Sequence, residues 1–203
     1  RTAGSREKFE GTLLDYLELV QEDPSIVKTA HQRLYGALSK HGIEKMPESD
    51  PRRSKIFNND GIKVYDYFKD EFFGMEKVIM KIMRFLKSAA HKGEESRQVL
   101  LLMGPVGAGK SALTEHIKRS LEGETYYHLK NDPQRGEPLQ LVPRSLREVF
   151  SEKLDVQIEG DISPVARHLL LTEHNKEYEN FPVVETTFSQ RGRRGVASVP
   201  PMD

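Results

Sequence analysis

The chain has 203 residues, enough for one large domain or for a domain with an extension. Its 31 lysines and arginines balance its 31 aspartates and glutamates, and this zero net charge argues against a dedicated nucleic-acid-binding protein. It has no cysteine, which excludes disulfides, thiolate metal sites and cysteine nucleophiles, and it has no apolar run long enough to predict a membrane-spanning helix.

The first 60 residues are expected to form a helical N-terminal extension and a linker. Thr12 and Asp15 have the spacing of a capping box, and apolar residues at helical spacing follow them. Asp23-Pro24 breaks this helix and predicts the start of a second one, which Gly42 ends. Residues 44–61 are rich in Pro, Ser, Asp and Arg, which is typical of a linker.

Residues 61–203 are expected to form the main domain. Residues 62–65 predict a short strand after the Asp60-Gly61 turn signal. Apolar residues of 76–90 recur at helical spacing and end before Lys92-Gly93. Further along, residues 125–129 and 181–188 predict strands, 131–138 a polar loop and 145–154 a helix. The sequence holds no internal repeat and no low-complexity tract.

The strongest motif of the sequence lies at residues 104–111. Residues 98–103 are a continuous apolar run, which predicts a buried strand of a parallel sheet. The run leads into a full G-x-x-x-x-G-K-[ST] match, and apolar residues from 112 to 121 predict a helix after it. Strand, glycine loop and helix are the context that a phosphate-binding loop requires.

The residue types of this loop suit a triphosphate. Glycines allow successive N–H groups to turn toward an anion, and the helix that begins near Lys110 adds partial positive charge. Lys110 would reach the β- and γ-phosphates as the catalytic lysine, and the hydroxyl of Ser111 would ligate Mg²⁺. The predicted binding residues are Gly104, Pro105, Val106, Gly107, Ala108, Gly109, Lys110, Ser111 and Ala112. The expected cofactors are ATP and Mg²⁺.

ATP hydrolysis would also need an acidic residue at the end of a second strand. Glu173 and Glu185 each follow an apolar run, but a helix face and an ordinary strand are the better interpretations of these runs. The basic cluster at 191–195 could contact phosphate, another subunit or nucleic acid, and a solvated loop is its usual meaning. The histidines have no zinc-binding spacing.

Several further stretches of the sequence are informative in combination: Phe9–Leu17, Glu71–Glu76, Met103–Ser111, Glu137–Leu139 with Val142-Pro143, and Gln157–Asp161. Together they resemble the PrkA-type serine protein kinases, whose N-terminal region is an AAA-type ATPase domain. The resemblance covers nearly the whole chain, from about residue 9 to 203. It implies a longer protein with a C-terminal kinase-like region, and an acidic motif, sensor residues and arginine finger beyond Asp203.

The stretch around Phe72, Phe73 and Gly74 is similar to the segment that precedes the first core helix in AAA+ proteins and there lies beside the adenine. An adenine pocket needs an apolar or aromatic wall, so we expect residues 72–74 to line it, with Gly74 allowing close approach of the base. The alternative is that both phenylalanines belong to the core.

We therefore expect an α/β fold of the P-loop NTPase type, AAA+-like, with a largely parallel sheet flanked by helices and a helical N-terminal extension. The expected function is the ATP-binding domain of a cytoplasmic serine protein kinase that acts on protein substrates as a homo-oligomer. No HRD, DFG or APE triplet occurs, so the residues themselves do not indicate phosphoryl transfer to protein. An AAA+ motor for remodelling or proteolysis, and a nucleotide-sensing interaction domain, remain the alternatives.

Overall fold

The computed structural model describes residues 8–58 and 61–188. The chain divides into two compact units, of which one combines residues 1–27 with 123–203 and the other comprises 28–122. Each unit is described separately, and the domain boundary expected near residue 60 stays a prediction. None of the described helices is long and apolar enough to cross a membrane.

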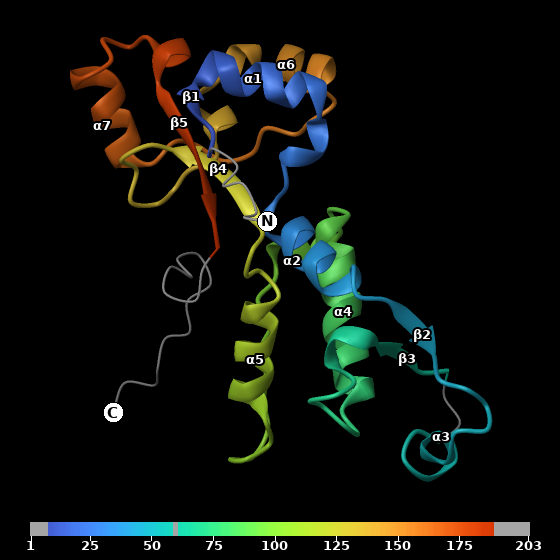
Figure 1. Ribbon diagram of the computed structural model, residues 1–203. Coiled ribbons are helices and arrows are strands. Elements are labelled where there is room, and N and C mark those ends of the chain that lie inside the picture. The colour runs from blue at the N-terminus through green and yellow to red at the C-terminus, as the bar shows by residue number, and fades with distance from the viewer. Residues whose placement is uncertain (1–7, 59–60, 189–203) are drawn as a thin grey trace, which may run out of the picture. The chain divides into compact units, whose positions relative to one another are not determined.

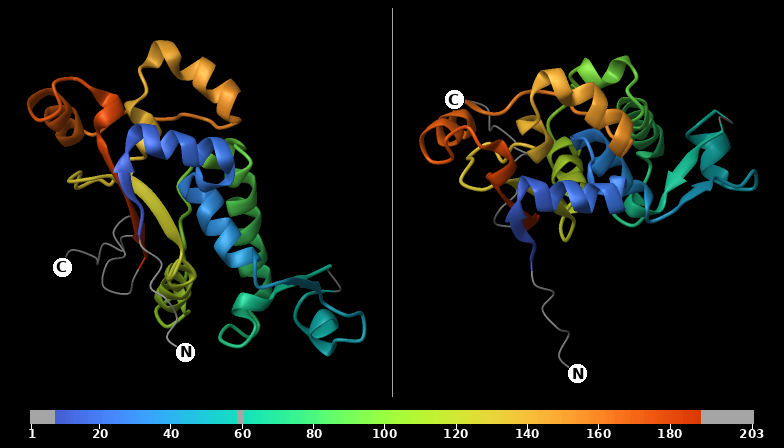
Figure 2. Two further views of the ribbon diagram at one scale, coloured as in Figure 1. Left: turned by 45° about the horizontal axis from the view of Figure 1, so that its top comes forward. Right: turned by 90° about the horizontal axis from the view of Figure 1, so that it is seen from above.

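The unit formed by 1–27 and 123–203 is built on a three-stranded antiparallel sheet (Figure 1). The elements of this unit are β1 (Glu10–Thr12), α1 (Leu13–Glu22), β4 (Thr125–Leu129), α6 (Arg147–Leu154), α7 (Pro164–Thr172) and β5 (Pro182–Thr187). The strand order is β1-β5-β4, and Val184 of β5 lies opposite Glu10 on one side and His128 on the other. Figures 1 and 2 show α1, α6 and α7 gathered around this sheet.

The capping box predicted at the start of α1 is confirmed. The hydroxyl of Thr12 accepts a hydrogen bond from the Asp15 backbone N–H, and the Asp15 carboxylate accepts one from the Thr12 N–H at 2.7 Å. Two N–H groups that the helix leaves without an internal acceptor are thereby satisfied. The Thr12 N–H and the Thr12 hydroxyl both donate to the Asp15 carboxylate, and these hydrogen bonds lower the pKa of Asp15. Behind the cap, Leu13, Tyr16 and Val20 are buried against the sheet residues Leu129 and Val183.

The unit formed by residues 28–122 is mainly helical. Its two strands form an antiparallel pair, with Ile43 opposite Tyr65. The elements are α2 (Ala30–Ser39), β2 (Ile43–Lys45), α3 (Pro51–Lys55), β3 (Lys63–Tyr65), α4 (Glu76–Ala90) and α5 (Lys110–Arg119). Short 3-10 turns occur in both units, at Pro24–Ile26, Asp66–Phe68, Glu94–Arg97, Pro138–Leu141, Arg144–Leu146 and Tyr178–Asn180.

Helix α4 is the central element of this unit, and its bounds match the apolar pattern of the sequence. Ile79, Ile82, Met83 and Leu86 are buried on one face, as expected for apolar residues three and four positions apart. Figure 1 shows α2 lying along α4, and Leu38 of α2 joins the same apolar cluster. This cluster also includes Leu113 of α5, so the helix that follows the glycine loop is anchored to α4.

The second predicted helix is interrupted. Asp23 caps the 3-10 turn Pro24–Ile26 rather than a long helix, and α2 begins anew after Thr29. Thr29 and Gln32 form a second capping box, which explains the restart: the Thr29 hydroxyl accepts from the Gln32 N–H, and the Gln32 side chain accepts from the Thr29 N–H.

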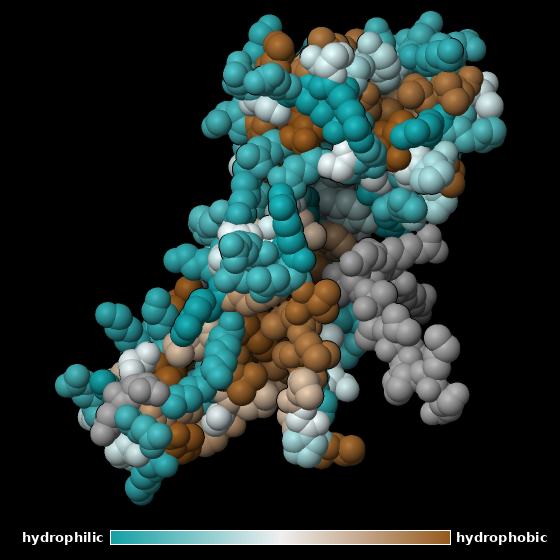
Figure 3. All heavy atoms as spheres, turned by 180° about the vertical axis from the view of Figure 1, so that it is seen from behind, coloured by the Kyte–Doolittle hydropathy of each residue, from teal (hydrophilic) through white to brown (hydrophobic). Residues whose placement is uncertain are grey.

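The largely parallel sheet is not confirmed, because both sheets of the described residues are antiparallel. The prediction of a buried strand at 98–103 is wrong: the segment forms no strand, and Val99, Leu101 and Met103 are largely exposed. The physical reason is that no described strand pairs with its backbone, and a strand needs such a partner for its N–H and C=O groups. Figure 3 shows apolar side chains gathered on the surface of the molecule seen from behind.

Candidate functional site

The glycine loop makes a tight turn between residues 98–103 and α5. Gly107 and Gly109 have φ angles of 82° and 74°, in the left-handed region that glycine enters without the penalty of a side chain. Gly109 is the residue directly before α5. The first hydrogen bond of this helix is donated by the Leu113 N–H to the Gly109 carbonyl. The N–H groups of residues 110–112 therefore have no acceptor within the helix and are available to a ligand.

The ammonium of Lys110 is folded back over this loop. Its Nζ donates to the carbonyl oxygens of Gly104 at 2.8 Å and Pro105 at 2.6 Å. Two neutral carbonyls therefore hold the positive charge over the turn. An anionic oxygen could displace them, because it would accept a stronger, charge-assisted hydrogen bond from the ammonium. Ser111 and Ala112 are exposed at the start of α5.

The segment that precedes α4 lies against the glycine loop. Met75, the residue before α4, has its sulfur 3.8 Å from the position that a Cβ on Gly109 would occupy. Phe72 is buried in the apolar cluster around α4, whereas Phe73 is 73% exposed. Gly74 has a φ of 80° with open space around it, so this turn requires glycine for its backbone conformation. The structure thus places Met75, the residue after the predicted segment 72–74, beside Gly109 of the glycine loop.

Arg52 also contacts this segment, and the sequence analysis did not identify it. Arg52 is part of the short helix α3, inside the stretch expected to be a linker. Its guanidinium lies 2.7 Å from carboxylate oxygens of both Asp50 and Glu76, and it stands over the ring of Phe73. The available signal was Asp50-Pro51, a helix-start pattern, but the partner Glu76 lies 24 positions away from Arg52.

His116 ties α5 to the residues before α4. Its Nε2 lies 2.8 Å from the carbonyl oxygen of Tyr67, and the Tyr67 hydroxyl donates to the His116 carbonyl at 2.8 Å. Its Nδ1 lies 2.9 Å from a carboxylate oxygen of Glu71, without the geometry of a hydrogen bond. The imidazole also packs beside the rings of Phe68 and Phe72. These polar and aromatic contacts therefore hold α5 against the segment 67–72.

The two candidate acids lie in the other unit. Glu185 of β5 accepts a hydrogen bond from the Phe9 backbone N–H at 3.1 Å, and Glu173 directly follows α7. The interpretation of 169–173 as helical and of 182–185 as a strand is confirmed. In the part of the chain that is described, no group of three or more acidic or histidine side chains could hold a metal ion. The basic cluster 191–195 lies outside the described residues.

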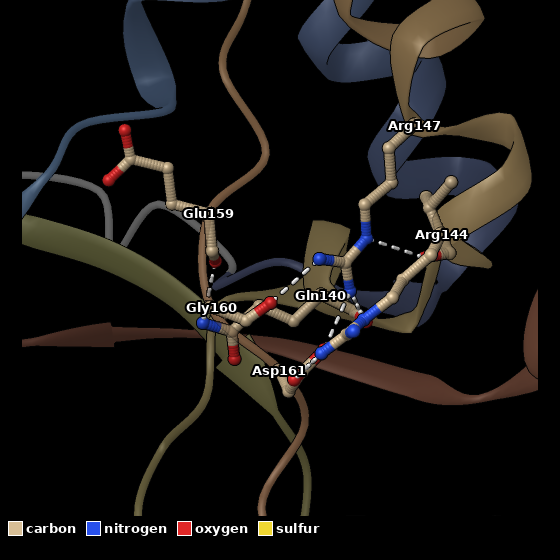
Figure 4. Close-up of polar contacts among 7 residues, drawn as sticks. Gln140, Arg144, Arg147, Glu159, Gly160 and Asp161 are labelled. Carbon is tan, nitrogen blue, oxygen red and sulfur yellow. Dashed lines mark hydrogen bonds and ion pairs between the residues drawn. The ribbon is translucent and has the colours of Figure 1, made fainter.

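A second polar cluster occupies the unit formed by 1–27 and 123–203 (Figure 4). The guanidinium of Arg147 donates to three backbone carbonyls, those of Gln140, Val142 and Gly160, at 2.7 to 3.1 Å. Asp161 accepts from Arg144, whose hydrogen bond lowers the pKa of that carboxyl. The Arg147 side chain is only 17% exposed. Its hydrogen bonds join the loop before α6 to the loop before α7, and we call this set of contacts the Arg147 clamp.

The chain was also compared with known proteins. The family profile described as "PrkA AAA domain" matches residues 11–203. The "ATP-dependent protease PrkA" of Bacillus subtilis is 33% identical over 210 residues, which cover the whole chain and 31% of that protein. The "Serine/threonine kinase YeaG" of Escherichia coli K12 is 36% identical over 156 residues, which cover 77% of the chain and 23% of the relative.

A weaker similarity links part of the chain to another group of proteins. The "Lon protease homolog, mitochondrial" of Drosophila melanogaster is 30% identical over 64 residues, or 32% of this chain and 6% of that protein. No solved structure matches the chain. The chain spans less than a third of the length of the PrkA and YeaG relatives.

Proposed function

The chain belongs to the family of PrkA AAA domains, and from this premise we propose that it binds Mg²⁺·ATP at residues 104–112. The observation that carries the proposal is the position of Lys110. Its ammonium lies over a turn made by two left-handed glycines, at the start of a helix whose first N–H groups are open. Lysine, open N–H groups and the helix dipole together provide what a triphosphate requires.

The residues of the loop fit the proposed cofactors. Lys110 would leave the carbonyls of Gly104 and Pro105 to bind the β- and γ-phosphates, and the exposed hydroxyl of Ser111 would hold Mg²⁺. When bound, Mg²⁺ would neutralise charge on the phosphate oxygens. Residues 72–74 would border the adenine, with the buried Phe72 supporting the turn and the exposed Phe73 facing the ligand.

Titration with adenine nucleotides tests the proposal. In the presence of Mg²⁺, we expect ATP and ADP to bind and AMP to bind at least about tenfold more weakly, because AMP lacks the phosphates that the loop and Lys110 would contact. Isothermal titration calorimetry measures all three affinities. An AMP affinity equal to that of ATP would show that the phosphate loop does not carry the binding.

We expect the chain by itself to hydrolyse ATP slowly. Hydrolysis by P-loop enzymes needs an acid beside the bound Mg²⁺, and of the two candidates Glu185 already accepts a hydrogen bond from Phe9. Phosphate release should stay at least about a hundredfold below an ordinary kcat of about 1 s⁻¹. Steady turnover that is lost in Glu173→Gln or Glu185→Gln would show that one of these residues completes the site.

For the full-length protein we propose ATP-dependent phosphorylation of protein substrates by a homo-oligomer, as the name of the kinase relative suggests. The name of the Bacillus relative favours a second candidate, ATP-driven proteolysis. Incubation of the full-length protein with γ-labelled ATP and a general protein substrate separates the candidates. Labelled protein supports the kinase, whereas free phosphate with loss of substrate supports the protease. Neither product supports a nucleotide sensor.

A further inference from the structure

The two units of the chain carry opposite charge. Residues 28–122 contain 18 lysines and arginines and 12 aspartates and glutamates, whereas the rest of the chain contains 13 and 19. The zero net charge of the chain is therefore the sum of +6 in one unit and −6 in the other. Such an asymmetry indicates that each unit can attract a partner of the opposite sign.

The outward side of α4 concentrates the positive charge of its unit. Lys77, Lys81 and Arg84 follow one another at spacings of four and three residues, which places them on one side of the helix, opposite its buried side. Residues 77–93 contain no aspartate or glutamate. Lys81 and Arg84 are exposed, and among the described residues neither has a carboxylate as its ion partner. We call this side of the helix the α4 face, and its charge is available to a partner.

The outward side of α6 repeats this pattern with the opposite sign. Glu148, Glu152 and Asp155, which directly follows α6, have the same spacings of four and three residues and are exposed. None of the three forms an ion pair in the part of the chain that the structure describes. An exposed valine follows the first charge in both patterns, Val78 at 43% on α4 and Val149 at 48% on α6. This α6 face therefore matches the α4 face in spacing, over about 10 Å of helix.

We propose that the α4 face of one molecule binds the α6 face of a second copy of this chain. Opposite charges at equal spacing would attract each other, and the exposed valines would add apolar area beside them. Because the two faces differ, the contact is heterologous, and its repetition produces a ring or an open chain of molecules. This contact would serve the homo-oligomer proposed above, but it requires no bound nucleotide.

A nucleic acid is a less suitable partner for the α4 face. The other unit of the same molecule has a net charge of −6 and would repel a phosphate backbone. A second copy instead offers carboxylates fixed at the helical spacing of the cations. The observations therefore favour self-association.

Sedimentation velocity without nucleotide tests the proposal. At low ionic strength and about 100 μM protein, a concentration suited to a small and transient interface, the parent chain should form oligomers. They should dissociate in 1 M salt, which screens charges beyond about 3 Å. Lys81→Glu with Arg84→Glu should weaken self-association at least about tenfold, and so should Glu148→Lys with Glu152→Lys, because like charges would then face each other.

The chain that carries all four substitutions provides the decisive comparison. Its faces have exchanged signs and are complementary again, so it should self-associate like the parent, whereas general damage to the structure would not be repaired. Lys45→Glu with Lys63→Glu is the matched control, because it changes the net charge of the same unit equally on the exposed strands β2 and β3. The control should associate like the parent. Circular dichroism checks that each variant is folded, as expected for changes at exposed positions.

The outcomes separate this inference from nucleotide binding. A parent that stays monomeric overturns the inference, and so does an equal loss of association in the matched control. A folded chain with all four substitutions that fails to associate overturns it as well. A monomeric parent that binds single-stranded RNA through Lys81 and Arg84 would show that the partner is a nucleic acid. ATP affinity should be unchanged in every variant, so failure of the self-association leaves the proposed function intact.

Discussion

Lys110→Ala should abolish tight binding of ATP. The substitution removes the one full positive charge at the start of α5 that is held by carbonyls of its own loop. A hydrogen bond to a charged group contributes about 1.5–3 kcal/mol, so the affinity should fall by at least about tenfold to a hundredfold. Calorimetric titration with Mg²⁺·ATP measures the change.

Lys81→Ala is the matched control for this experiment, because Lys81 is an exposed lysine on α4 outside the proposed site. It should bind ATP as the parent does. Equal affinities of the parent and Lys110→Ala would contradict the assignment of Lys110 to the phosphates, whatever the control shows.

Arg147→Ala should strongly destabilise the unit formed by residues 1–27 and 123–203. Three backbone carbonyls, at Gln140, Val142 and Gly160, would lose a charged donor in a region where the Arg147 side chain is only 17% exposed. We expect a loss of about 2–4 kcal/mol in the free energy of unfolding, since several charge-assisted hydrogen bonds are removed together. Urea denaturation followed by circular dichroism measures this loss.

Arg144→Ala provides the contrast on the same cluster (Figure 4). Arg144 is 79% exposed and pairs with Asp161 at the surface, where ion pairs contribute little. Its unfolding midpoint should stay close to that of the parent. Hydrogen exchange should become faster in residues 138–162 of Arg147→Ala and not of Arg144→Ala. Equal free energies of unfolding of the two variants would show that the hydrogen bonds of the Arg147 clamp contribute little to stability.

Local patterns in the sequence predicted local structure well. The apolar spacing of 76–90 gave the bounds of α4, and Thr12 with Asp15 gave the start of α1. Both signals depend on residues three or four positions apart, whose interaction is decided within one helical turn. The helix after the glycine loop was predictable for the same reason.

Contacts between distant residues were not predictable from these patterns. The apolar run 98–103 has the composition of a buried strand, but a strand exists only where another strand pairs with it, and none of the described strands does. Strand β1 was missed because three residues carry no periodicity and form a strand only beside β5. Arg52 was missed because its partners Phe73 and Glu76 are more than about 20 positions away in the sequence and contact it only in the folded chain.

The most direct test of the central claim is to locate bound nucleotide on the chain. Addition of Mg²⁺·ATP to the ¹⁵N-labelled chain should shift backbone amide resonances of residues 104–112 in a saturable way, with Gly107 and Gly109 among the most affected because their N–H groups would face the phosphates. Residues 73–76 should shift with the same affinity, since they lie against the loop through Met75. Saturable shifts confined to other residues, with 104–112 unchanged, would contradict the account.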